Sequence, residues 1–202
     1  MKVKVNNLFP TPVVEYNLNR NFTEQEINYM FYKDLKDNLG NLGTVDCNVL
    51  EKEEMKDIKY FLLDCLNEYI DNILVPKNKI LPYITESWIN VTKTGGFHHL
   101  HTHPNSFISG VMYISADAEK DKIYFHKKDS LFILDIETDN YIITNSNKWW
   151  LPAKPGTLYL FPSLLSHEVV KTDSEHLRVS LSFNTFLKGI ISTNYTSRLT
   201  LN

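Results

Sequence analysis

After residue 79 the chain becomes a succession of short segments rich in β-branched and aromatic residues, with turn-forming residues between them. Seven such segments follow one another: residues 83–92, 107–115, 122–126, 141–144, 156–161, 167–172 and 177–186. Strands of this length and spacing are typical of an antiparallel sandwich or barrel rather than of alternating β/α units. This pattern therefore predicts a mainly-β fold for the larger part of the chain.

The N-terminal part of the chain has a helical pattern instead. Its prolines favour an extended entry strand over residues 8–14, because the residue before a proline avoids the helical conformation. Residues 23–26 form a capping box, which predicts the start of a helix that Gly40 and Gly43 would end. Apolar residues recur at three- and four-residue spacings over residues 51–74, so we expect a second, longer helix there.

Together these patterns predict a single domain over residues 1–202. We expect an N-terminal strand and helical layer over residues 1–79, and a β core over residues 80–188 that packs against two or more helices. Residues 189–202 would form a C-terminal tail.

Charge and composition argue against several classes of function. The chain carries 21 Lys and Arg against 24 Asp and Glu, without a basic cluster, so a nucleic-acid-binding surface is not expected. Its apolar runs are too short to cross a bilayer, and no secretory signal follows the N-terminus. The two cysteines, Cys47 and Cys65, make no disulfide framework, which favours a cytoplasmic location. The alternating charges of residues 117–129 are typical of a solvated hairpin.

Histidines are concentrated just before the second predicted strand. Four of the seven in the chain lie within residues 98–103. A strand places residues i and i+2 on one face, so His101 and His103 can point together into a barrel, as can His99 and His101. Two imidazoles in this arrangement suit a divalent metal such as Fe(II), Zn(II) or Cu(II). The most natural third ligand is His167, which lies in the later segment over residues 155–169.

The last predicted strand carries a polar face. Arg178, Ser180, Ser182 and Asn184 alternate there with apolar residues. A buried arginine needs an anionic partner, because an unpaired guanidinium in the interior is very costly. A ligand carboxylate held by Arg178, with Ser180 donating alongside, would satisfy it.

These motifs occur in the order found in a known family. His101-x-His103, Pro155-Gly-x-Leu-x-x-Phe-Pro, His167-x-Val169 and Arg178-x-Ser180 together resemble the Fe(II)- and 2-oxoglutarate-dependent oxygenases, in particular a group with a His-x-His-Pro-Asn motif. The resemblance implies a double-stranded β-helix, or jelly-roll, fold. It also implies Fe(II), 2-oxoglutarate and dioxygen as cofactor and cosubstrates, and hydroxylation of a substrate C–H bond with release of succinate and CO2. The primary substrate is not indicated.

The resemblance also assigns the metal ligands, with one departure. His101 and His167 would be two ligands of the facial triad, and no catalytic residue is implied beyond the ligands. The family usually has Asp or Glu two residues after the first histidine, and His103 stands there. Either three histidines hold the iron, or His103 lies outside the coordination sphere and a water completes it. His99 is an alternative ligand if the strand register differs, and otherwise lies at the pocket rim with His98.

The cosubstrate residues follow from the same resemblance. Arg178 would pair with the distal carboxylate of 2-oxoglutarate, and Ser180 would be its hydrogen-bonding neighbour. Tyr113 and Asn90 lie on predicted barrel strands and could reach the cosubstrate. For these two, a satisfied polar group of the core is an equally good interpretation.

Two other interpretations remain open. The first is a cupin with different metal chemistry: Gly95 before His101-x-His103 resembles a cupin motif, but the glutamate expected downstream is missing. The second is a non-catalytic jelly roll that binds a ligand or a partner, with a degenerate metal site. The apolar N-terminal segment and the edge strands of a jelly roll are compatible with a homodimer. Formation of succinate that depends on 2-oxoglutarate would separate the oxygenase from both alternatives.

Overall fold

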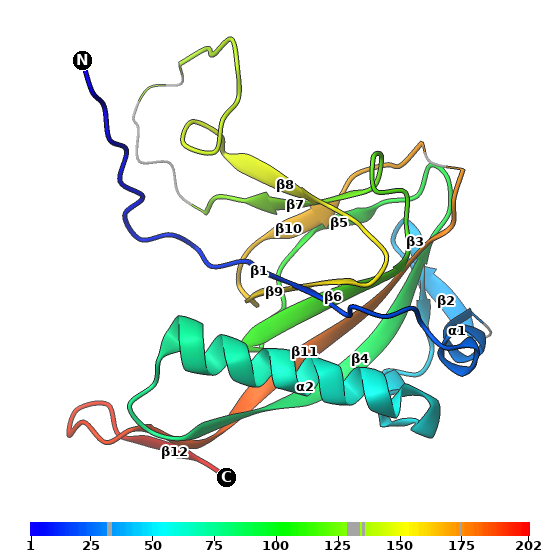
Figure 1. Ribbon diagram of the computed structural model, residues 1–202, viewed down its shortest axis with the longest axis horizontal. Coiled ribbons are helices and arrows are strands. Elements are labelled where there is room, and N and C mark those ends of the chain that lie inside the picture. Colours follow the sequence, from blue (N-terminus) through cyan, green and yellow to red (C-terminus); the bar gives the residue numbers. More distant parts are fainter. Residues whose placement is uncertain (32–33, 129–133, 135, 174) are drawn as a thin grey trace.

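A computed structural model describes residues 1–202 except 32–33, 129–133, 135 and 174. It consists of two antiparallel sheets that face each other, with helices on the outer side of the larger one (Figure 1). The larger sheet has the order β1 (Val14–Asn17), β9 (Thr157–Pro162), β6 (Ile108–Ser115), β11 (Arg178–Ser192), β4 (Ile80–Thr92), β3 (Asn41–Thr44) and β2 (Leu35–Asn38), with β12 (Leu199–Leu201) paired to β11. The smaller sheet has the order β5 (His98–His101), β10 (His167–Val169), β7 (Lys122–His126) and β8 (Lys148–Pro152). This arrangement confirms the predicted mainly-β, jelly-roll class.

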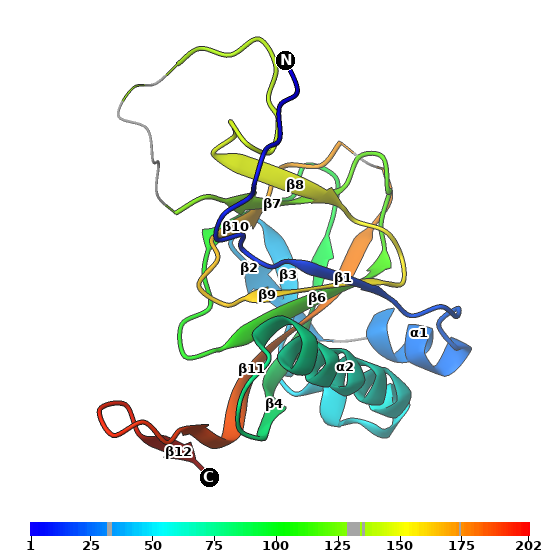
Figure 2. The same ribbon diagram turned by 60° about the vertical axis from the view of Figure 1, so that its left-hand side comes forward.

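The helices lie on the face of the larger sheet that points away from the smaller sheet. The long helix α2 (Lys56–Tyr69) crosses β11 and β4, and α1 (Glu24–Phe31) lies near its N-terminal end (Figures 1 and 2). Short 3₁₀ turns at Val49–Glu51 and Glu53–Met55 lead into α2, and a π turn at Ile70–Leu74 follows it. No helix among the described residues has the length and apolar character needed to cross a bilayer.

The main core lies between α2 and the larger sheet. Ile58, Leu62 and Leu66 form one stripe of α2 and are fully buried, as the three- and four-residue spacing predicts. They belong to the same cluster as Val179 and Leu181 of β11. Burying each aliphatic side chain contributes roughly 1.5–3 kcal/mol, so this layer fixes the position of β11 and with it the strand's opposite face.

A smaller apolar cluster lies between the two sheets. It brings Val111 and Tyr113 of β6 together with Ile123 and Phe125 of β7 and with Phe161 of β9. Because side chains alternate along β6, the residues between them enter the main core instead. Both faces of β6 are therefore buried, and the polar site described below is surrounded by apolar walls.

Gly110, on β6, offers a test of this packing. A Cβ atom there would lie 2.2 Å from Cζ of Phe183 and 2.9 Å from Cδ2 of Leu160. We expect Gly110→Ala to lower the free energy of unfolding by about 1–3 kcal/mol, the usual cost of overpacking a core. Gly43→Ala is the matched control, because its nearest neighbouring atom lies 3.8 Å away. Denaturant unfolding of both variants measures this, and equal stability of the two would contradict the packing described here.

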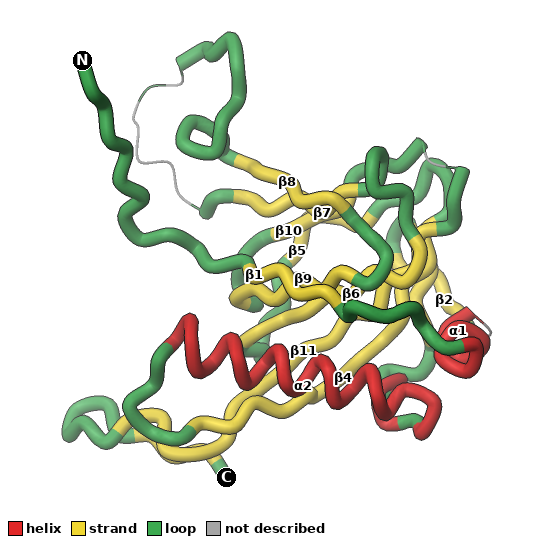
Figure 3. Tube along the Cα trace, in the orientation of Figure 1, coloured by secondary structure: helices red, strands yellow, loops and turns green. Residues whose placement is uncertain are grey.

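The structure corrects three expectations for the local elements. The helix that begins at the capping box is α1, which ends at Phe31, and Gly40 lies instead in the turn between β2 and β3 with φ of 109°. Residues 141–144 form a turn rather than a strand, as the loop colouring in Figure 3 shows. The expected tail over residues 189–202 contains the end of β11 and β12. The division of the chain at residues 79 and 188 stays a prediction, although β1, β2 and β3 all join the larger sheet.

Candidate metal centre and cosubstrate pocket

The inner face of β11 supplies the polar floor of a pocket between the two sheets. Arg178, Ser180 and Ser182 line this pocket, whereas Val179 and Leu181 point into the core beneath α2. The alternation predicted for this strand is thus observed. The strand is fixed in the middle of the larger sheet by pairing with β4 on one side and β6 on the other. The floor of the pocket is therefore among the most strongly constrained parts of the fold.

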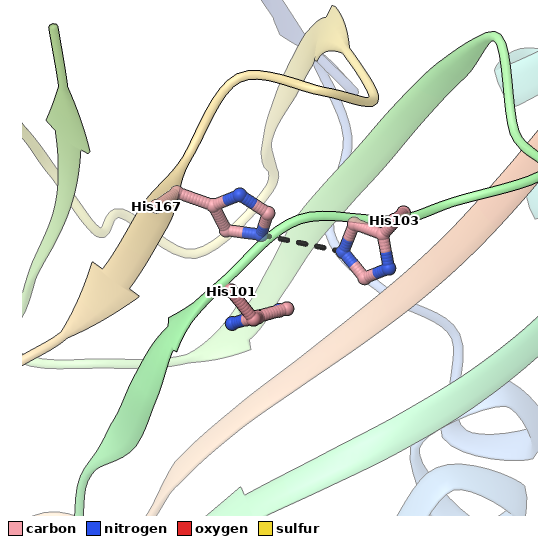
Figure 4. Close-up of side chains that lie close together, drawn as sticks. All are labelled: His101, His103 and His167. Atoms are coloured by element: carbon pink, nitrogen blue, oxygen red, sulfur yellow. Dashed lines mark hydrogen bonds between the residues drawn. The ribbon is translucent and has the colours of Figure 1, made fainter. Parts of the chain in front are cut away.

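Three histidines meet above this floor, as Figure 4 shows. His101 at the end of β5 pairs directly with His167 of β10, and His103 follows β5 two residues later. One ligand nitrogen from each of the three lies within 4.8 Å of the other two. Nε2 of His103 and Nε2 of His167 are 3.3 Å apart. Because imidazole nitrogens bind Zn(II) at about 2.0–2.1 Å, a small side-chain adjustment would bring all three onto one ion.

Backbone carbonyls fix the tautomers of two of these rings. His101 Nδ1 donates to the carbonyl oxygen of His99 at 2.7 Å, and His167 Nδ1 donates to that of Leu165 at 2.9 Å. A carbonyl can only accept, so both Nδ1 atoms carry the proton and both Nε2 atoms keep a free lone pair. Hydrogen bonds of this kind orient the ligating histidines of metal sites.

The protonation state of the cluster also suits a metal. Burial, followed by repulsion from neighbouring imidazoles, lowers the pKa of His167 to about 3 and that of His103 to about 4. Burial lowers the pKa of His101 as well. At pH 7 all three rings are therefore neutral, which is the form that binds a metal ion. The donor set of three neutral imidazoles fits Fe(II), Zn(II) or Cu(II).

The two remaining histidines of the cluster differ in position. His98 lines the pocket, and its ring stacks on that of His101 with centroids 4.3 Å apart. Burial lowers the pKa of His98 to about 3, so this ring is neutral as well. His99 is exposed and contributes its carbonyl group to His101. The arrangement does not favour His99 as a substitute ligand.

Arg178 lies in the same pocket, but it already has a partner. Its side chain is 4% exposed, and Nη1 lies 3.2 Å from Oδ1 of Asp121, whose side chain is fully buried. The anionic partner that a buried arginine needs is therefore already present within the protein, before any ligand carboxylate binds. The expectation of a solvated hairpin over residues 117–129 is wrong at Asp121. Its carboxylate is buried and paired with Arg178, although the surrounding charges had indicated a surface position.

The remaining predicted residues form one row across the larger sheet. Asn90 pairs with Ser180, and Ser180 pairs with Tyr113, so their side chains share the inner face. All three line the pocket. The Asn90 amide donates to Ser182 Oγ at 3.1 Å, while Asn90 Oδ1 is buried without a partner among the described residues.

Sequence reasoning missed Asn41, which also lines the pocket. It lies on β3, and its buried Oδ1 has no hydrogen-bond partner within the part of the chain that the structure describes. Buried acceptors without a partner are rare, and in an active-site pocket they are available to a ligand or an ordered water. The sequence carried no signal for Asn41, because the hairpin of β2 and β3 had been expected to be helical.

His103 departs from the family pattern in a way that can be tested. We expect His103→Asp to keep iron binding, because the shorter carboxylate is also a good ligand for Fe(II) and the other two ligands keep their backbone hydrogen bonds. Metal affinity of the purified variant, measured by competition with a chelator, checks this. Loss of the metal site in a folded His103→Asp variant would indicate that three imidazoles are obligatory.

A comparison with protein families covers the part of the chain that holds the candidate site. Residues 86–184 match the model of the family described as "Putative 2OG-Fe(II) oxygenase", and this range holds all seven of the predicted site residues. No match was found among curated protein sequences.

Solved structures of similar fold include three of particular interest. HygX from Streptomyces hygroscopicus, with nickel and 2-oxoglutarate bound, has a TM-score of 0.61 at 10% identity, covering 87% of this chain and 82% of that one. A prolyl-4-hydroxylase from Pseudomonas putida has a TM-score of 0.54 at 13% identity, covering 86% and 92%. An oxidoreductase of the 2OG-Fe(II) oxygenase family from Burkholderia pseudomallei has a TM-score of 0.55 at 13% identity, covering 79% and 74%. At these identities the likeness shows a common fold.

Proposed function

Since this chain belongs to the 2OG-Fe(II) oxygenase family, we propose that it hydroxylates a C–H bond of a primary substrate, consuming 2-oxoglutarate and dioxygen and releasing succinate and CO2. The observation that carries the proposal is the presence, in one pocket between the sheets, of a three-histidine cluster and a buried arginine. The first can hold the iron and the second can hold an anionic cosubstrate.

In this proposal His101, His103 and His167 hold Fe(II) through their imidazole nitrogens. When bound, the iron supplies the redox chemistry that couples oxidation of 2-oxoglutarate to oxidation of the substrate. The three rings offer ligand nitrogens within 4.8 Å of one another, and the backbone carbonyls of His99 and Leu165 hold two of the rings in place. This preorganisation reduces the cost of assembling the site around the ion.

Arg178, Ser180, Tyr113 and Asn90 bind the cosubstrate in this proposal. Arg178 donates to the distal carboxylate. Ser180, two residues further along β11, and Tyr113, which pairs with Ser180, place their hydroxyl-bearing side chains next to Arg178 in the pocket. Hydrogen bonds from a guanidinium to a carboxylate are about twice as strong as those between neutral groups. Val111, Ile123 and Phe161 form apolar walls that keep bulk water from this charge pair.

Hydroxylation is proposed because the solved structures of similar fold include a prolyl-4-hydroxylase. Proteins with the same fold include the epimerase SnoN and the carbocyclase SnoK, so the fold does not choose the outcome of the reaction. The cupin alternative gives Arg178 and Ser180 no ligand to bind in the pocket. The non-catalytic alternative predicts no turnover of 2-oxoglutarate.

An anaerobic titration tests the proposal. The metal-free protein is titrated with Fe(II) and then with 2-oxoglutarate, and we expect a visible charge-transfer band only when both are present. His126→Ala should give the same band, because His126 lies on β7 with its ring bonded to Glu168, outside the three-histidine cluster. Admission of oxygen should then yield succinate. A folded protein that binds iron but gives neither band nor succinate would overturn the proposal.

A further inference from the structure

We propose that Asp121 is a positioning residue for the cosubstrate: it holds one edge of the Arg178 guanidinium and supplies its permanent counter-charge, so that the remaining N–H groups of Arg178 face the pocket. This inference rests on the proposed function, since it concerns the distal carboxylate of 2-oxoglutarate. The sequence indicated a ligand carboxylate as the partner of Arg178 and gave no sign of a second carboxylate from the protein.

The carboxylate of Asp121 is fixed by its surroundings rather than free to follow a ligand. Oδ2 accepts the backbone N–H of Asp117 at 2.9 Å, while Oδ1 faces Arg178. The backbone of Asp121 is also anchored: its N–H donates to the carbonyl of Asp117 at 2.7 Å, and its carbonyl accepts from Ala153 at 2.9 Å. Asp121 thus belongs to a tight turn just before β7, and its carboxylate is a rigid point of attachment.

The guanidinium keeps spare donors. It carries five N–H groups in a planar fork, and within the described part of the chain it donates to Asp121 through Nη1. Arg178 also lines the pocket next to Ser180 and Tyr113. A fixed carboxylate that holds Nη1 restricts the directions of the remaining N–H groups, because the fork is planar and rigid. A second carboxylate arriving from the pocket would meet donors that are already aligned.

The charge balance of the pocket is the second observation that concerns Asp121. Imidazoles bind a metal ion in their neutral form, so the charged side chains here are Arg178, which lines the pocket, and its partner Asp121. A divalent ion and a dianionic cosubstrate cancel each other. Asp121 therefore compensates the buried charge of Arg178 both before and after the cosubstrate binds, which avoids the cost of an unpaired buried guanidinium.

The experiment compares two ligands that differ only in the distal carboxylate. The Zn(II)-loaded protein is titrated calorimetrically with 2-oxoglutarate and with 2-oxopentanoate, and the ratio of the two dissociation constants measures the contribution of that carboxylate. Zinc is used because it is not oxidised. We expect the wild type to prefer 2-oxoglutarate by roughly 10–100-fold, the value of a hydrogen bond to a charged group. Asp121→Asn should lower this preference about tenfold and leave the Zn(II) affinity unchanged.

Two further variants separate positioning from stability. Glu26→Gln is the matched control, because Glu26 is also a buried carboxylate bonded to an arginine, Arg20, but lies outside the pocket. It should lose stability without changing the ligand preference. If Asp121→Asn does not fold, Asp121→Glu keeps the counter-charge and displaces it by one methylene, so the preference should fall about threefold or more for this reason alone.

Each outcome has a definite meaning. A wild type that binds neither ligand, or binds both equally, contradicts the proposed function. If the wild type prefers 2-oxoglutarate and the Asp121 variants keep that preference, Asp121 is only a structural residue and the inference is wrong. A preference that increases in Asp121→Asn would also overturn it, because Asp121 would then compete with the cosubstrate for Arg178.

Discussion

His167→Ala is expected to abolish metal binding, and with it all turnover of 2-oxoglutarate. His167 connects the cluster: its Nε2 lies 3.3 Å from that of His103, and its backbone pairs with that of His101. Losing a group that merely orients a ligand costs about 10–100-fold in metal affinity or activity, so loss of the ligand itself should cost more. Competition with a chelator measures the affinity for Zn(II) and Fe(II), and succinate formation measures the activity.

The control for this variant is again His126→Ala, which removes an imidazole from the same sheet but outside the cluster. It should keep wild-type metal affinity. Thermal unfolding of the metal-free proteins shows whether His167→Ala is folded, since only a folded variant is informative. A folded His167→Ala protein that retains tight binding of one metal ion per chain would move the metal centre away from this cluster.

Much of the site could be predicted because its signals are local in the sequence. The alternation along β11 separates Arg178 and Ser180 from Val179 and Leu181, and strand periodicity alone gives this result. The stripe of α2 likewise follows from helical periodicity. Such patterns need no knowledge of which strands are neighbours.

The sequence placed His98 at the rim of the pocket, but its stacking on His101 could not be predicted, because it depends on an irregularity in strand pairing. His101 pairs with His167, but His98 pairs with Val169, so three residues along β5 correspond to two along β10. A bulge of this kind shifts the alternation of side chains between the two pairs. His98 and His101 therefore both face the pocket, although their spacing in a regular strand would place them on opposite faces.

Asn41 and Asp121 were missed for a different reason. Asn41 reaches the pocket through the pairing of β3 with β4, a contact between segments far apart in the sequence. Asp121 is one acidic residue in a charged stretch whose other members indicate a surface hairpin, and only the fold places it against Arg178. Residue patterns give the average environment of a segment, whereas an individual ion pair depends on its tertiary neighbours.

Arg178→Ala is expected to remove the affinity for 2-oxoglutarate. The affinity for Zn(II) should stay nearly intact, because only His101, His103 and His167 are expected to bind the metal. The variant loses the hydrogen bonds to the distal carboxylate, and it also leaves the carboxylate of Asp121 buried without its cation. Breaking a buried ion pair by removing one partner costs about 3–5 kcal/mol of stability, so thermal unfolding must accompany the binding measurement.

The double variant Arg178→Met with Asp121→Leu separates these two effects. Replacing a buried ion pair with apolar residues of similar volume is often neutral or stabilising by about 1–4 kcal/mol, so this protein should recover the stability that Arg178→Ala loses. It should still bind Zn(II) and still fail to prefer 2-oxoglutarate over 2-oxopentanoate, since no cation remains at this end of the pocket. If the double variant kept the wild-type preference, another group would hold the distal carboxylate. The buried pair of Arg178 and Asp121 would then be structural, and the cosubstrate end of the pocket would have to be sought elsewhere.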